Sequence, residues 1–210
     1  RDVERSRGLG DVYKRQTLKA AVVDRREAMQ LLMGYNSFNG YVWNKLFDLQ
    51  LIRENDIRFH ADYPACEDTM FVGSYLYHCS RVCVTEECLY CYRQVSGGAN
   101  RGRYSGRKAY DPKWMSVFEM TEYMADLYKD DAVTAACRLH EVREAGIVLR
   151  SMEAAGYHGA DHARLKGILR RGAGLFFRDE NSGRSQKLSV LLSCISPKLE
   201  LAVWKLRNRK

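Results

Sequence analysis

Two adjacent acidic residues, Glu67 and Asp68, open a segment of apolar and aromatic side chains about a third of the way along the chain. The apolar positions that follow recur at the spacing of one helix face, so we expect both acids in the first turn of a helix. The positive end of the helix dipole keeps carboxylates ionised in that position. An ionised carboxylate can take a proton from a hydroxyl group, which makes Asp68 a candidate general base.

Three motifs in order around this pair resemble the catalytic domain of family 2 glycosyltransferases. They are an Asn-Lys segment at Asn44, the acidic pair before Phe71 and a Leu-Tyr-x-Tyr-Arg run that ends at Arg93, and the resemblance covers residues 28–96. It implies an α/β fold, namely a partial, Rossmann-like GT-A domain without its N-terminal nucleotide-binding half, followed by an α-helical C-terminal region. It also implies an inverting enzyme that transfers a sugar from a nucleotide-sugar donor, such as a UDP-sugar, to a glycan or lipid-linked acceptor in cell-surface polysaccharide synthesis.

The second acid of the pair matches the catalytic base of that family. By this resemblance, Asp68 takes the proton of the acceptor hydroxyl below the anomeric carbon of the donor sugar, and Glu67 orients the base or holds the acceptor. A divalent metal, Mg²⁺ or Mn²⁺, is the implied cofactor, but residues 17–66 contain no match to its Asp-x-Asp motif. We therefore expect no turnover of a sugar nucleotide by this chain alone. The alternative is a pair of acids that only stabilises the helix N-terminus.

Side chains on both sides of the pair are candidates for substrate binding. Trp43 could stack on a sugar ring, and Asn44 and Lys45 could hydrogen-bond the acceptor or a diphosphate oxygen. Tyr92 and Arg93 precede a Gly-rich segment, where a guanidinium could close over a departing nucleoside diphosphate. The alternatives are a core Trp, a Lys that extends to solvent and an ordinary surface Arg.

The cysteines favour reduced thiols over a disulfide framework. The chain has seven cysteines and no secretion signal, so we expect a cytoplasmic protein, or one that is peripheral on the inner face of the plasma membrane. Cys88 and Cys91 have the spacing of a zinc pair, but neither a second pair at that spacing nor a His at ligand spacing accompanies them. We therefore expect buried thiols and no metal ligands among the candidate residues.

The net charge of the chain alone excludes few classes of binding partner. The formal net charge is +8, but the basic residues are dispersed and no nucleic-acid-binding motif accompanies them, so we do not expect nucleic acid as a partner. An anionic membrane surface or a phosphorylated donor accounts for the same excess. Hydrophobic residues make up 46% of the chain, which is enough for a core. No apolar run reaches the ~18 residues of a membrane-spanning helix.

Residues 1–16 show no hydrophobic period, and residues 6–16 resemble the translation of a transposase sequencing adapter, residue for residue. We expect that this leader is not native protein and exclude it from the fold; the alternative is a native disordered tail. Residues 17–100 would then be the acceptor-side half of the catalytic domain, ending in a Gly-rich boundary, and residues 101–210 the helical C-terminal region.

Helix-start signals and hydrophobic periodicity place the individual elements. We expect helices at residues 25–33, 48–54, 67–78, 112–129, 131–156 and 161–171, an extended segment at 40–47, and strands at 57–60, 81–85 and 88–93. A polar, mobile segment is expected at residues 178–186. Two further short segments, at residues 187–194 and 198–207, flank Pro197.

The end of the chain, residues 187–210, is apolar with a basic rim. Amphipathic basic segments of this kind can lie in a membrane interface, so we expect peripheral membrane contact there, with packing on the catalytic domain as the alternative. This tail also supports a second hypothesis for the function. In that hypothesis the chain is a non-catalytic helical module that docks on an anionic membrane or on a partner protein.

Overall fold

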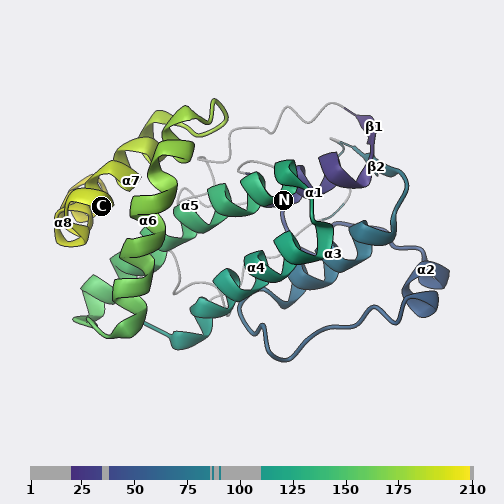
Figure 1. Ribbon diagram of the computed structural model, residues 1–210, viewed down its shortest axis with the longest axis horizontal. Helices are drawn as coiled ribbons and strands as arrows, with labels where there is room; N and C mark the ends of the chain where they lie inside the picture. The colour runs from purple at the N-terminus through teal and green to yellow at the C-terminus, as the bar shows by residue number, and fades with distance from the viewer. Residues whose placement is uncertain (1–19, 35–37, 86, 88–89, 91–109, 209–210) are drawn as a thin grey trace, which may run out of the picture.

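The computed structural model describes residues 20–34, 38–85, 87, 90 and 110–208 (Figure 1). Of these residues, 68% are helical and 4% lie in strands. The helices are α1 (Arg25–Met33), α2 (Leu49–Glu54), α3 (Glu67–His78), the 3-10 helix η3 (Pro112–Met115), α4 (Ser116–Tyr128), α5 (Asp131–Ala155), α6 (Ala160–Arg178), α7 (Arg184–Ile195) and α8 (Pro197–Arg207). The strands are β1 (Ala21–Val23) and β2 (Val82–Val84).

Within the described residues, the sheet consists of one antiparallel pair of strands. β1 and β2 lie side by side, with Ala21 opposite Val84 and Val23 opposite Val82. A Rossmann-like domain is built instead on parallel strands that are joined by crossover helices. The prediction of a partial GT-A domain of the α/β class is therefore wrong, and the described part of the chain is mainly helical with one two-stranded ribbon.

Two segments that were expected to be extended form no strand. Within residues 38–48 the chain turns, and the backbone amide of Lys45 donates to the Val42 carbonyl at 3.2 Å; residues 57–60 are irregular as well. A segment rich in β-branched and aromatic residues forms a strand only where a neighbouring strand pairs with it. Among the described residues, neither of these two segments has a neighbouring strand to pair with. The predicted strand at residues 88–93 falls outside the described residues except at its third position.

Aspartate side chains cap the starts of several helices. The Asp24 side chain accepts a hydrogen bond from the Glu27 amide at 2.9 Å at the start of α1, and Asp130 accepts from two amides of α5 at 2.9 and 3.1 Å. The predictions of α1 to α5 and of β2 are confirmed. α6 continues past its predicted end to Arg178, and α7 begins at Arg184, inside the segment that was expected to be mobile.

α5 crosses the molecule and takes part in two hydrophobic cores (Figure 1). Val133 and Cys137, near its start, pack with β1, β2, α1, α3 and α4. Leu149 and Met152, near its end, pack with η3, α4, α6 and α7. All four side chains are at most 1% exposed. The expected domain boundary near residue 100 lies outside the described residues and stays a prediction, although the first core draws on both sides of it.

A buried ion pair fastens α8 to α5. The guanidinium of Arg150 donates to both carboxylate oxygens of Glu200, at 2.7 and 2.6 Å, and the two side chains are 12% and 4% exposed. The Ser189 hydroxyl on α7 donates to the same carboxylate at 2.6 Å. One acid therefore joins three helices, and this forked geometry fixes the orientation of α8 on α5.

We expect Arg150→Met to lower the free energy of unfolding by about 3 kcal/mol, because it leaves the Glu200 carboxylate buried without its cation. The double variant Arg150→Met/Glu200→Met should recover most of this loss, since two packed apolar side chains replace the ion pair. Urea denaturation followed by circular dichroism measures both changes. A double variant that is no more stable than the single variant would contradict this account.

Candidate functional site

The predicted base lies at the start of α3, against the loop that carries the predicted binding residues. Glu67 is exposed and Asp68 is half-buried in the first turn of the helix. The loop of residues 38–48 packs on this turn at Gly40, where an added Cβ would lie 2.6 Å from the Cβ and 2.8 Å from the Cα of Thr69. Only a glycine permits so close an approach to the helix backbone.

Contacts with α4 hold the start of α3 from the other side. The backbone amide of Ala65 donates to the Ser116 hydroxyl at 3.4 Å, and the Cys66 thiol donates to the Ser116 carbonyl at 3.5 Å. Cys66 is buried and stands at the N-cap position of α3. The first turn of α3, with Asp68 in it, is therefore fixed between the loop and α4.

The ammonium group of Lys45 is enclosed by its own loop. It has three protons to donate and four oxygen atoms at 2.7–3.2 Å, which are the backbone oxygens of Phe38, Asn39 and Tyr41 and the side-chain oxygen of Asn44. The side-chain amide of Asn44 also donates to the Phe38 carbonyl at 3.1 Å. Lys45 and Asn44 thus hold the loop in shape, a role that the sequence pattern did not indicate.

Lys45 and Asp68 lie within electrostatic reach of each other. Burial lowers the pKa of Lys45 to about 8, and the negative charge of Asp68 acts in the opposite direction. The predicted base and a predicted binding residue from a different segment therefore interact electrostatically. The close packing of Gly40 on α3 is the contact that makes this possible.

Trp43 belongs to a small group of aromatic rings. Its ring stacks on Tyr41 with centroids 5.1 Å apart and lies tilted against Tyr90 at 4.8 Å. A sugar ring that stacks on Trp43 would have to fit beside these two tyrosines. The predicted role of Trp43 in sugar stacking stays a prediction. Tyr92 and Arg93 lie outside the described residues, so their predicted place at the site also stays a prediction.

The carboxylate of Asp68 has the chemistry of a base. A half-buried carboxylate that is held beside an ammonium group can accept a proton from a hydroxyl. Within the described residues, the group of side chains that could hold a metal ion lies elsewhere, at Glu153, His158 and His162. The divalent metal that the glycosyltransferase resemblance implies stays a prediction.

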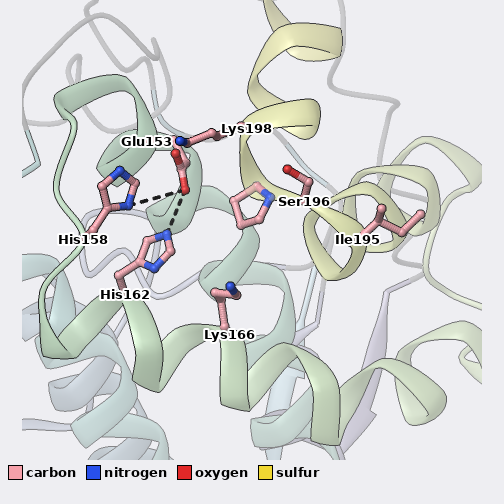
Figure 2. Close-up of a pocket in the computed structure, with 8 residues that line it drawn as sticks. Glu153, His158, His162, Lys166, Ile195, Ser196 and Lys198 are labelled. Carbon is pink, nitrogen blue, oxygen red and sulfur yellow. Dashed lines mark hydrogen bonds and ion pairs between the residues drawn. The ribbon is translucent and has the colours of Figure 1, made fainter.

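The second group lies where α5 meets α6, and the sequence reading missed it (Figure 2). Glu153, His158 and His162 line a cavity of about 290 Å³, together with the corner between α7 and α8. Their sequence spacing is Glu-x4-His-x3-His, which does not place three side chains on one face of a continuous helix. The available signal was the pair of glycines, Gly156 and Gly159, which indicates a turn between the acid and the second histidine.

We expect Gly40→Ala to force the loop away from α3, because the new Cβ meets the backbone of Thr69 as well as its side chain. The free energy of unfolding should fall by about 1–3 kcal/mol, and the tryptophan fluorescence of the protein should change because Trp43 lies in this loop. Gly174→Ala is the control, since an added Cβ there meets nothing within 4 Å and should stabilise α6 by about 0.5–1 kcal/mol. Wild-type stability of Gly40→Ala would argue against the close packing.

Comparison with protein-family models, with curated proteins and with solved structures finds no match to this chain. The resemblance to family 2 glycosyltransferases therefore rests on the three motifs within residues 28–96. What it implies for the fold is wrong, and what it implies for the chemistry of Asp68 stays a prediction.

Proposed function

We propose that the first turn of α3 and the loop of residues 38–48 form the acceptor site of a glycosyl-transfer enzyme, with Asp68 as its general base. The observation that carries the proposal is that the loop packed on the first turn of α3 at Gly40 holds the half-buried Lys45, whose ammonium interacts electrostatically with the half-buried Asp68. Acids that only stabilise a helix N-terminus need no such loop. The order of the three motifs also supports this function.

In the proposed reaction Asp68 accepts the proton of an acceptor hydroxyl while the hydroxyl oxygen forms a bond to the anomeric carbon of the donor sugar. The bond from that carbon to the nucleoside diphosphate breaks, and the configuration inverts because attack and departure are on opposite sides. Lys45 attracts the charge of Asp68 and holds its own loop in shape. Glu67 is exposed beside the base and contacts the acceptor, and Arg93 is the candidate for the departing diphosphate.

Asp68→Asn tests the base. The amide keeps the shape of the side chain but cannot accept the proton, so kcat for sugar transfer should fall by about 10²- to 10⁴-fold. Transfer from UDP-sugars to glycan or lipid-linked acceptors is measured in a protein in which a donor-binding segment precedes this chain. Asp126→Asn makes the same change at an exposed position of α4 and should leave kcat unchanged. Undiminished transfer by a normally folded Asp68→Asn variant would exclude the base role.

A second candidate function, docking on an anionic membrane, is favoured by the exposed apolar side chains of α7 and α8. These large side chains are 44–68% exposed: Leu188, Leu191 and Ile195 on α7, and Leu199 and Leu206 on α8. Residues 184–208 carry five basic side chains and one acid, Glu200, which is paired with Arg150. Apolar side chains with a basic rim are typical of helices that lie in a membrane interface. Among the described residues, no helix has both the length and the apolar character needed to cross a bilayer.

Liposome co-sedimentation tests this docking. The protein should pellet with vesicles that contain phosphatidylglycerol, and not with phosphatidylcholine alone, and added salt should release it. Leu191→Gln/Ile195→Gln should lower the bound fraction by about tenfold, because two half-exposed apolar side chains no longer enter the lipid. Leu49→Gln changes an equally exposed leucine on α2 and should have no effect. Equal pelleting of the double variant, or a stable dimer that covers these side chains, would exclude a membrane as their partner.

A further inference from the structure

A tight turn between α5 and α6 brings three metal-binding side chains together (Figure 2). α5 is capped by Gly156, whose φ of 70° lies in the left-handed region that favours glycine. The turn folds His158 back towards Glu153, which lies in the last turn of α5. His162 stands in the first turn of α6, and both imidazole rings point to the Glu153 carboxylate.

The distances within this group suit a single metal ion. Glu153 Oε1 lies 2.8 Å from His162 Nε2 and 3.8 Å from His158 Nδ1, and the ligand atoms of all three lie within 4.8 Å of one another. Two ligands that each lie about 2.1 Å from a tetrahedral zinc ion are about 3.4 Å apart. Side-chain movements of about 1 Å would therefore complete the coordination.

Burial distinguishes this group from a chance cluster on the surface. The side chains of Glu153 and His162 are 4% and 12% exposed, and His158, at 47%, reaches solvent. A buried carboxylate must be compensated for its lost hydration. Among the described residues its ion-pair partners are these two imidazoles. A divalent cation bound between the three side chains would compensate the carboxylate.

Contacts outside the ligand set brace the turn. The Tyr110 hydroxyl donates to the Asp161 carboxylate at 2.8 Å, next to His162 in the sequence. The Tyr110 ring also packs against Tyr157, next to His158, with centroids 4.7 Å apart. Tyr110 therefore fixes Asp161 and Tyr157, which are the sequence neighbours of His162 and His158. Such support orients ligands before a metal binds.

We propose that Glu153, His158 and His162 form a zinc site, a proposal that is independent of the function of Asp68. Two imidazole nitrogens and one carboxylate oxygen are a set that zinc uses where it keeps a fourth position open, whereas Mg²⁺ and Ca²⁺ prefer oxygen ligands. The ligands line a cavity of about 290 Å³ that Lys166 and Lys198 also line. Their ammonium groups attract anions, so the fourth position takes an anionic ligand such as phosphate.

Titration of the untagged protein with Zn²⁺ tests the site. Isothermal calorimetry should show saturable binding of one ion per chain at this site, and zinc should raise Tm because it binds the folded state. The affinity should fall as the pH falls, since protons compete for the imidazole nitrogens. Bound Co²⁺ should give the visible spectrum of a tetrahedral site without the sulfur-to-metal absorption that thiolate ligands produce. A spectrum with that absorption, or no binding, would overturn the proposal.

Variants locate the ion. His158→Ala should weaken zinc binding by at least about tenfold, and it keeps the fold because its side chain is half exposed. Glu153→Gln and His162→Ala should do the same, whereas His60→Ala removes an exposed imidazole elsewhere and should change nothing. All variants retain the seven cysteines, so zinc on thiols cancels in the comparison. Equal zinc affinity of wild type and His158→Ala would place the ion elsewhere.

The anionic ligand is tested separately with inorganic phosphate. Phosphate should shift the Co²⁺ spectrum of the wild type, because it enters the fourth position beside the two lysines. The shift should be much weaker in Lys166→Met/Lys198→Met, which keeps all three metal ligands. A wild-type spectrum that phosphate does not change, or a shift that survives in the double variant, would overturn the assignment of this position to an anion.

Discussion

The burial of α5 in two cores at once is the interaction on which the rest of the structure depends. Its first turns close the core that contains α1 and α3, and its last turns close the core that contains α6 and α7. A single helix of 25 residues therefore sets the spacing between the Asp68 region and the cavity beside Glu153. Polar contacts add to the burial, since the guanidinium of Arg143 donates to the carbonyl of Met33 at the end of α1, at 3.2 Å.

Local signals were enough to predict most helices, and they failed where a contact between distant segments decided the structure. Asp24 and Asp130 cap the helices that their positions indicated, because a cap needs only the next three residues. The aromatic composition of residues 40–47 suggested a strand, but a strand also needs a partner. In its place, the enclosed ammonium of Lys45 and the packing of Gly40 on α3 hold this segment as a loop.

The two candidate sites also differ in how far a local sequence pattern could predict them. Asp68 could be proposed from sequence because adjacent acids before an apolar helix are a local pattern, and the structure places them in the first turn of α3 as expected. The cluster at Glu153 has no local pattern, since its residues come together only after a left-handed glycine reverses the chain. Lys45 lies between these cases: the sequence marked it as a candidate binding residue, whereas its four oxygen partners could be seen only in the folded loop.

The corner between α7 and α8 is part of both the helical hairpin and the cavity beside Glu153. Ser196 and Pro197 join two helices that expose large apolar side chains, and they also form one wall of the cavity beside Glu153. Three residues further on, the Glu200 carboxylate clamps α8 to α5. A molecule that fills the cavity would therefore contact the same residues that set the angle between α7 and α8.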